Sequence, residues 1–371
     1  MKLLASFPYL AALANAAAVE LDQRATPSPL DFKIEMVGNS QIKASITNTG
    51  NSALRVFKTG SILDSRPIEK VKVSHGGKQA WSPRVVVPFS GMRVYVEPSL
   101  ADAEEDFQTI AAGETVEVQW DAAEVHDLSA GGAFDFATAG ALAYTYAVDG
   151  NDSKTAEIAG AAIYQSNVVT AHQVDGAAAA SVGHAFHAKT KKRTTVQADC
   201  DGAQRSVLKD TLGYCRAYAK GGAAAASSGD TGKLEEYFKS SSTETRGTVE
   251  EVFNRIVSEC GSSAGGAPRT HCADIWPGGN CQGGVVAYTI PWESYIVYCS
   301  SWFGYPATAG NCHEVDRPFI MLHETTHLTE VKGTQDYGCY GYECARGLSP
   351  HQNINHADTY ALFANAIAVG C

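Results

Sequence analysis

The apolar positions at the start of the chain form one short block. Residues 3–13 are largely apolar and follow Lys2, and three alanines occupy positions 16–18. Such a run is too short to span a bilayer, and small residues after it are typical of a signal-peptide cleavage site. We therefore expect residues 1–18 to be a signal peptide, with a buried N-terminal helix as the alternative. No later run is long and apolar enough for a membrane helix.

The first half of the chain then alternates polar and apolar residues over short stretches. Strand patterns occur at residues 31–36, 41–46, 85–87, 115–120 and 143–146. Turn signals that contain glycine separate them, at residues 38–39, 50–51 and 76–77. Several short strands at this spacing predict a small, all-β, sandwich-like domain. We find no cluster of catalytic side chains in it.

The second half changes to the spacing of helices. Helical periodicity is found at residues 204–220, 233–238 and 249–257, and a last helix is expected over residues 350–369. Residues 284–290 and 295–298 are predicted to be short strands. The 178 residues after Arg193 are enough for one domain with its own core. The fold class expected for the whole chain is α+β.

The strongest candidate for chemistry is the run HETTH at residues 323–327. On a helix, His323 and His327 lie on one face, so both imidazoles can reach one metal ion. Glu324 is then placed to take a proton from water. The run also arises by chance on surface helices, but the four apolar residues before it favour a helix packed beneath a cleft.

The third metal ligand has several candidates. Gly333 occupies the position at which a metzincin would carry its third histidine, so that class is excluded. Gly333 can instead end the helix and let the chain turn back toward the metal. The candidate ligands after this turn are Asp336, Glu343, His351, His356 and Asp358.

These motifs together resemble the deuterolysin family of secreted fungal zinc metalloendopeptidases, the aspzincins. The resemblance is carried by HETTH, by GTQD at residues 333–336 and by NHADTYALFANAI at residues 355–367, and it extends from about Thr194 to Cys371. It implies a mainly helical, zincin-like catalytic domain with a small β-sheet. It also implies one Zn²⁺ held by His323, His327 and Asp336, with Asp358 orienting a histidine ligand. The reverse assignment of the two aspartates stays open.

The chain departs from the family pattern beside the GTQD turn. The family continues GTxDxxYG, whereas Tyr340 comes one residue late here, next to Cys339. The resemblance implies a tyrosine that stabilises the developing oxyanion, so either Tyr340 or Tyr342 is expected in that role. Glu324 is expected to be the general base.

All 10 cysteines lie at or after Cys200, and an even number in a secreted chain predicts disulfides. The resemblance implies the pairs Cys200–Cys272, Cys281–Cys299 and Cys312–Cys371. Cys215, Cys260, Cys339 and Cys344 then remain. The first two fall on or beside predicted helices and could join them, and the last two could close a small loop beside the metal site.

A dibasic pair, Lys192-Arg193, stands between the two halves of the chain. A charge run is often only a solvated surface, but this one lies in a polar link where the resemblance begins. We expect a dibasic processing protease to cut after Arg193. Residues 19–193 would then be a propeptide that assists folding or covers the cleft, and residues 194–371 the mature enzyme.

The charge of the chain limits its partners. The formal net charge is −11, and after Arg193 there are 12 Lys and Arg against 19 Asp and Glu, a balance of −7. This argues against nucleic acid as a partner, because nucleic-acid binding requires a basic face. An acidic cleft favours basic substrates, which agrees with the family's preference for histones and protamines. We expect a secreted, extracellular monomer.

Two alternative functions remain at this point. One is a lysine-specific metalloendopeptidase of the same family. The other is a secreted zinc-binding protein without catalysis, since a structural zinc site is closed by four protein ligands.

Overall fold

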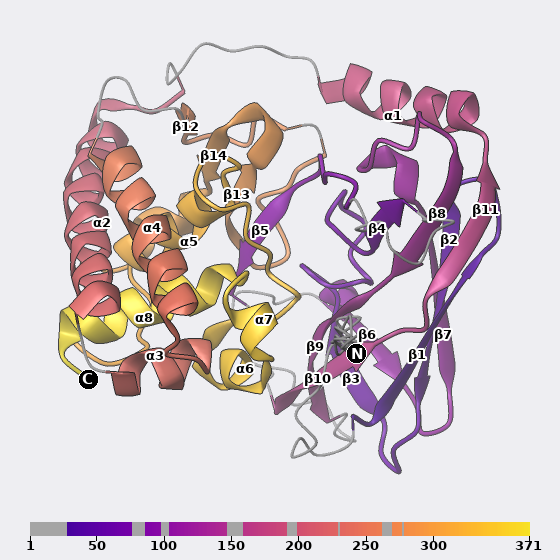
Figure 1. The fold of residues 1–371 in the computed structure, drawn as a ribbon, viewed down its shortest axis with the longest axis horizontal. Coiled ribbons are helices and arrows are strands. Elements are labelled where there is room, and N and C mark those ends of the chain that lie inside the picture. The colour runs from indigo at the N-terminus through magenta and orange to yellow at the C-terminus, as the bar shows by residue number, and fades with distance from the viewer. Residues whose placement is uncertain are drawn as a thin grey trace, which may run out of the picture.

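The computed structural model describes residues 28–75, 86–97, 104–146, 159–190, 199–228, 231–261, 269–276 and 278–371. These residues form a β-rich N-terminal half and a helical C-terminal half that lie side by side (Figure 1). In this part of the chain, no helix combines the length and the apolar character that crossing a membrane would need. The expected signal peptide, the turn at residues 76–77 and the dibasic pair Lys192-Arg193 lie outside the described residues.

The N-terminal half contains three small antiparallel sheets around one apolar core. The first has the order β1 (Leu30–Met36), β2 (Gln41–Asn48), β7 (Thr115–Asp121). The second has the order β10 (Gly160–Gln165), β9 (Ala139–Tyr146), β3 (Leu54–Phe57), β6 (Phe107–Ile110). The third has the order β11 (Val169–Val174), β8 (Gly132–Ala137), β4 (Lys72–His75). In β1 every second residue is buried, as the alternating sequence predicts.

The N-terminal half is not all-β, which corrects the expectation from its sequence. Helix α1 (Gly176–Thr190) follows β11, in an alanine-rich run for which we predicted no helix. Alanine has the highest intrinsic helix propensity, so such a run forms a helix readily once its first turn is capped. The cap is Asp175, whose Oδ1 accepts hydrogen bonds from the backbone N–H groups of Ala177 and Ala178.

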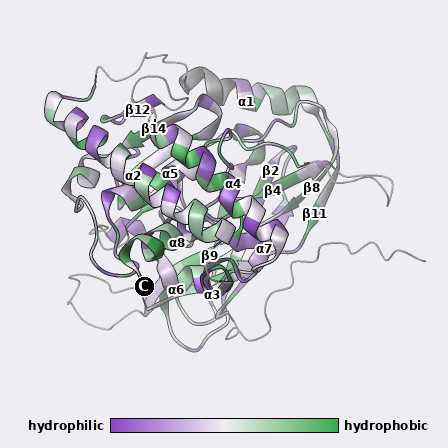
Figure 2. Cartoon of the chain, turned by 60° about the vertical axis from the view of Figure 1, so that its left-hand side comes forward, coloured by the Kyte–Doolittle hydropathy of each residue, from purple (hydrophilic) through white to green (hydrophobic). Residues whose placement is uncertain are grey.

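The C-terminal half is built from helices packed around a second apolar core. They are α2 (Gly202–Ser228), α3 (Thr231–Phe238), α4 (Thr243–Cys260), α5 (Arg317–His327), α6 (Gly341–Gly347), α7 (Pro350–Asn353) and α8 (Ala357–Val369). Hydrophobic and hydrophilic residues alternate around α2 and α4 (Figure 2), so each buries one face. Gly222 lets these two helices approach closely, because a Cβ there would lie 2.8 Å from the ring of Phe253.

The helix expected over residues 350–369 is divided into α7 and α8. The chain leaves the helix at Asn355 and His356 to pair with Gln335 in a short parallel bridge. The N–H of Gln335 donates to the carbonyl of Asn355 at 2.8 Å, and the N–H of Ala357 donates to the carbonyl of Gln335 at 3.1 Å. This break starts α8 beside the GTQD turn and places Asp358 in its first turn.

A four-stranded sheet connects the two halves. Its order is β12 (Arg269–His271), β14 (Tyr295–Tyr298), β13 (Val285–Ile290), β5 (Arg93–Val96). The sequence predicted β13 and β14 within the C-terminal half, but β5 comes from the N-terminal half and lies along β13 (Figure 1). The small sheet of the helical half is therefore completed by a strand from before residue 194.

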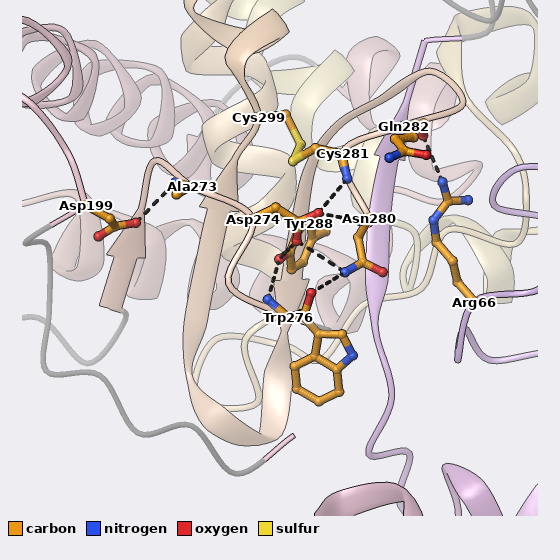
Figure 3. The surroundings of a disulfide bond; sticks show 10 residues. All are labelled: Arg66, Asp199, Ala273, Asp274, Trp276, Asn280, Cys281, Gln282, Tyr288 and Cys299. Atoms are coloured by element: carbon orange, nitrogen blue, oxygen red, sulfur yellow. Dashed lines mark hydrogen bonds between the residues drawn. A yellow bond between two sulfur atoms is a disulfide. The ribbon is translucent and has the colours of Figure 1, made fainter. Parts of the chain in front are cut away.

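The loop before β13 is held by an aspartate and a disulfide (Figure 3). Asp274 accepts hydrogen bonds from the hydroxyl of Tyr288, at 2.7 Å, and from the backbone N–H of Cys281, at 3.1 Å. The disulfide Cys281–Cys299 ties the same loop to the end of β14. From the N-terminal half, Arg66 Nη2 donates to the carbonyl of Gln282 at 2.8 Å. The start of β13 is thus fixed from both sides.

The ten cysteines form five disulfides. They are Cys200–Cys272, Cys215–Cys260, Cys281–Cys299, Cys312–Cys371 and Cys339–Cys344. The second joins α2 to α4 and the last closes a short loop at the start of α6. These are the pairs that the resemblance implied and that the remaining four cysteines allowed.

Buried charges anchor β5 to the N-terminal half. Arg93 Nη2 lies 2.6 Å from Oε2 of Glu69, and Lys72 Nζ lies 2.5 Å from the same oxygen. Burial alone would raise the pKa of Glu69, but Arg93 and Lys72 outweigh it and lower this pKa to about 2. Burial also lowers the pKa of Lys72 to about 8.

We predict that Glu69→Gln destabilises the full chain, because it leaves Arg93 buried without its charge partner. The expected loss in the free energy of unfolding at pH 7 is about 3 kcal/mol. The native pKa of Glu69 is lower than its usual value of 4.5, so the carboxylate stabilises the fold above pH 4.5 and less as the pH falls toward about 2. The difference between variant and parent should shrink over this range in urea unfolding.

Glu105→Gln is the matched control, since Glu105 is exposed in the N-terminal half. It should leave the unfolding curve unchanged at both ends of the pH range. Equal stability of the Glu69→Gln variant and its parent at pH 7 would contradict the anchoring role.

Candidate metal and active site

Helix α5 carries the HETTH run and is buried along its whole length from Pro318 to His327. Its N-terminus is capped by Asp316, whose Oδ1 accepts from the N–H of Phe319 at 2.7 Å. The hydroxyl of Tyr218 on α2 donates to the other oxygen of Asp316 at 2.7 Å. Asp316 thus caps the helix, and a buried tyrosine holds the cap in place.

Three ligand-type atoms converge at the end of α5. The Nε2 atoms of His323 and His327 lie 3.0 Å apart, and Oδ1 of Asp336 lies 3.1 Å from each of them. Both histidines are fully buried, and Asp336 is 6 % exposed. Within the described residues, this is the one group of at least three His, Cys, Asp or Glu that could hold a metal ion.

The other ring nitrogens of both histidines already have partners. His323 Nδ1 lies 2.7 Å from Oδ1 of Asp358, and the second oxygen of Asp358 accepts from the N–H of Gly341 at 2.6 Å. His327 Nδ1 lies 3.1 Å from the carbonyl oxygen of Thr334. Such contacts fix the tautomer of a metal-binding histidine and leave its Nε2 available. Asp336 lies on the Nε2 side of His323 and Asp358 on the Nδ1 side.

Glu324 lies beside these atoms and is also fully buried. The hydroxyl of Thr289, on β13, donates to its Oε2 at 2.6 Å. Burial raises the pKa of Glu324 to about 8, and the nearby His323 and Thr289 limit the rise. Its Oε1 has no hydrogen-bond partner of good geometry in the described part of the chain. The sequence did not single out Thr289, because nothing local relates it to a residue 35 positions away.

The structure separates the two candidate tyrosines. Tyr340 has its ring centroid 6.4 Å from that of His323, and its hydroxyl donates to the carbonyl of Val94 at 2.8 Å. The hydroxyl of Tyr342 points elsewhere and donates to Glu236 at 2.6 Å. Of the two, only Tyr340 is brought to the site.

The remaining candidate ligands lie away from the three converging atoms. Glu343 and His351 are exposed. His356 is buried, but its ring nitrogens contact the hydroxyl of Thr359, at 2.9 Å, and the carbonyl of Cys339, at 2.8 Å. No fourth protein ligand therefore joins the group among the described residues.

Comparison with known proteins identifies the family of the chain. The model of the deuterolysin metalloprotease (M35) family matches the chain over residues 1–371. The chain belongs to this family. It is accordingly a metalloendopeptidase.

Relatives from other organisms match almost the whole chain. A neutral protease 2 homolog of Colletotrichum graminicola is 46% identical over 372 residues, covering 100% of both proteins. A neutral protease 2 homolog of Pyricularia oryzae is 46% identical over 362 residues, covering 98% of this chain and 97% of the relative. Among solved structures, a zinc peptidase from Grifola frondosa aligns with a TM-score of 0.38 at 20% identity, covering 45% of this chain and 97% of the other.

A metalloprotease of this family requires a metal ion, typically zinc, and the three converging atoms fit one. Two imidazole nitrogens and one carboxylate oxygen are ligands that zinc accepts. Oδ1 of Asp336 is buried and has no hydrogen-bond partner of good geometry in the described part of the chain. A buried carboxylate oxygen without a partner is costly in a protein interior, and coordination to a cation would remove that cost.

The charges around this group also favour a cation. Burial opposes protonation of His323, but Asp336 and Asp358 together raise its pKa to about 10. Burial lowers the pKa of His327, and Asp336 only partly offsets this. The pKa values of the two imidazoles therefore shift in opposite directions, and one positive charge is retained between the two carboxylates. A bound dication would supply that charge in place of the proton.

We predict that Thr289→Val lowers kcat with little effect on KM, because Oε2 of Glu324 loses the hydroxyl that donates to it while the cleft keeps its shape. The expected loss is about tenfold, the cost of one buried hydrogen bond to a charged group. Thr289→Ser, which keeps the hydroxyl, is the matched control and should recover most of the rate. Steady-state kinetics on a peptide substrate, at equal metal content, provide the measurement. Equal kcat for the Val and Ser variants would contradict this role.

Proposed function

We propose that this chain is a zinc-dependent endopeptidase, secreted as a precursor and activated by cleavage after Arg193. The observation that carries the catalytic part is the convergence of His323, His327 and Asp336 with Glu324 alongside. Three protein ligands, with no fourth among the described residues, are the arrangement of a catalytic rather than a structural zinc site. This favours the peptidase over a zinc-binding protein without catalysis.

The chain's own residues would divide the work as follows. Zinc, when bound, supplies an acidic water and polarises the carbonyl of the substrate. Glu324 takes a proton through Oε1, while Thr289 holds Oε2, and it passes the proton on to the nitrogen of the departing amine. The hydroxyl of Tyr340 donates to the carbonyl oxygen as negative charge develops there. Asp358 keeps the ring of His323 in one tautomer.

Secretion and processing follow from the N-terminal sequence and the cysteines. Residues 1–18 would be removed as a signal peptide, residues 19–193 would form the propeptide and residues 194–371 the mature enzyme. Five disulfides favour an oxidising compartment outside the cytosol. The pair Lys192-Arg193 provides the dibasic site for a processing protease.

The preferred substrates would be basic proteins such as histones and protamines. The mature part carries 12 basic against 19 acidic residues, and a negative field attracts cationic chains. Electrostatic attraction of the substrate raises the rate of encounter rather than the rate of the chemical step, so it would appear as a higher kcat/KM at low salt.

The processed enzyme would act as a monomer.

We predict that Glu324→Gln keeps zinc at one equivalent per chain but lowers kcat on casein and histone by about 10²- to 10⁴-fold, because the general base is lost. Activity of the parent should disappear with a zinc chelator and return with added zinc. Glu251→Gln, on the exposed side of α4, is the matched control and should keep full activity. A zinc-loaded, active Glu324→Gln variant would disprove the assignment of the base.

A second prediction separates the two aspartates by metal content. Asp336→Ala should lose zinc on dialysis, because it removes one of three ligands. Asp358→Ala should retain zinc with an affinity weaker by about 10- to 100-fold, as expected when the partner of a ligating histidine is removed. Zinc is measured by atomic absorption after dialysis against buffers of fixed free zinc. If only Asp358→Ala loses the metal, the roles of the two aspartates are reversed.

A further inference from the structure

Strand β5 enters the helical half of the molecule alongside its catalytic residues. It pairs antiparallel with β13, and Tyr95 lies opposite Ala287. The pairing continues past β5, where the N–H of Glu97 donates to the carbonyl of Gly284 at 2.9 Å. All four residues of β5 are buried. Without β5, β13 would be the edge of the sheet, with main-chain groups open to another extended chain.

One peptide unit of β5 faces the groups that would act on a peptide bond. The carbonyl of Val94 accepts the hydrogen bond from Tyr340, at 2.8 Å. The backbone N–H of the next residue, Tyr95, interacts with the carboxylate of Glu324. Oε1 of Glu324 itself has no hydrogen-bond partner of good geometry in the described residues. Hydrolysis needs a donor at the carbonyl and a proton carrier at the amide, and Val94–Tyr95 presents both atoms in that order.

The side chain of Tyr95 fills space beside the metal-binding helix. It is 3 % exposed and belongs to the apolar core of the C-terminal half. Its ring centroid lies 4.9 Å from that of His323 and 6.2 Å from that of Phe319, both edge-on. An aromatic ring in such a pocket adds the largest share of apolar contact to an interface.

The N-terminal half holds this strand on the side away from β13. Arg93 pairs with the buried Glu69, and the N–H of Met92 donates to the carbonyl of Pro67 at 2.9 Å. The loop at Gly60 reaches Tyr340 itself, since a Cβ at Gly60 would lie 2.8 Å from the Tyr340 hydroxyl. Gly60 has φ +73°, a left-handed conformation that favours glycine.

We propose that the edge of β13 is the surface on which the backbone of a peptide substrate lies, and that β5 occupies it in the precursor as a built-in substrate-like strand, with Val94–Tyr95 at the place of the scissile bond. This inference rests on the proposed function, because it assumes peptide hydrolysis at the HETTH site. While β5 is in place, no other extended chain can pair with β13. The N-terminal half therefore inhibits the enzyme by occupying the substrate's hydrogen-bonding edge.

The register defines the reaction of a free peptide with the sequence of residues 91–97, GMRVYVE. The oxygen of water forms a bond to the carbonyl carbon of Val94, the C–N bond to Tyr95 breaks, and a proton moves to the Tyr95 nitrogen. The products are GMRV with a new carboxylate and YVE with a new amino group. In the precursor both sides of this bond stay anchored, so a cut would not release the strand, whereas a free peptide leaves after hydrolysis.

The first test uses the full chain with Lys192→Ala and Arg193→Ala, which removes the dibasic processing site. This precursor should show low activity on a short fluorogenic peptide. Adding Tyr95→Ala should raise the activity about tenfold or more, because truncating a buried aromatic anchor weakens the strand's hold. Adding Arg66→Ala instead is the matched control, since it removes a contact between the halves outside the cleft, and it should leave the activity low. A folded Tyr95→Ala precursor as inactive as its parent would overturn the proposal.

The second test uses only the parent precursor, so it does not depend on whether a variant folds. Parent precursor is cleaved after Arg193, and the peptide GMRVYVE is added to the processed enzyme. It should compete with the fluorogenic substrate and be hydrolysed only between Val94 and Tyr95, as mass spectrometry reports. The same peptide with Tyr95→Ala should compete about tenfold less well, and a scrambled peptide should not compete. Cleavage at any other bond, or inhibition without cleavage, would overturn the register.

A failure of the proposed function and a failure of the β5 assignment give different experimental results. If the processed enzyme hydrolyses neither casein nor the peptide, the proposed function is wrong. If it hydrolyses casein but GMRVYVE does not compete, the function stands and the assignment of β5 to the substrate edge is wrong.

Discussion

The interaction on which the site depends is the hydrogen bond between His323 and Asp358, because two imidazoles lie completely inside the protein. A buried ring nitrogen without a partner is costly, so each nitrogen must be satisfied by the fold or by a ligand. Asp358 satisfies one of them from the first turn of α8, and that helix begins there because the chain breaks at His356 to pair with Gln335. The division of the last helix is therefore what brings a carboxylate behind the metal-binding ring.

The second constraint is the open side of β13. A three-stranded sheet formed by the helical half alone would leave the backbone of this strand unpaired at the edge, beside Glu324 and Tyr340. An enzyme that cuts extended chains benefits from such an edge, but a folding precursor is exposed to unwanted pairing through it. Strand β5 protects this edge in the precursor. Because β5 belongs to the part of the chain before the proposed cut, the edge can become open in the processed enzyme.

The sequence predicted the elements whose signals are local. The HETTH run lies on a helix, α5, as its spacing predicts. Strands β1, β2, β7, β13 and β14 lie within a residue or two of their patterns. What it missed depends on contacts between distant segments. We predicted no strand at residues 93–96, and nothing in this segment indicates that it pairs with β13, nearly 200 positions away. Thr289 is likewise related to Glu324 only through the packing of β13 on α5.

The choice between Tyr340 and Tyr342 also depends on contacts that the sequence does not reveal. The two residues are two positions apart, and the inserted residue made their alignment ambiguous. Three-dimensional packing decides it, because Tyr342 stacks on His313 with its hydroxyl on Glu236 while Tyr340 contacts β5. α1 was missed for a different reason, since an alanine-rich run carries strong helix propensity but no amphipathic period to read.

The contacts between the halves have a consequence for how such proteins diverge. Besides Gly60 at Tyr340, a Cβ at Gly338 would lie 2.5 Å from the carbonyl oxygen of Ala141, and one at Gly140 would lie 2.7 Å from that of Tyr337. The N–H of Ala141 donates to that carbonyl of Tyr337 at 2.6 Å. At Gly140 and Gly338 the fit is between main chains. Any side chain at either position would meet the backbone of the other half, whatever its chemistry, so these two positions should keep glycine as related sequences diverge.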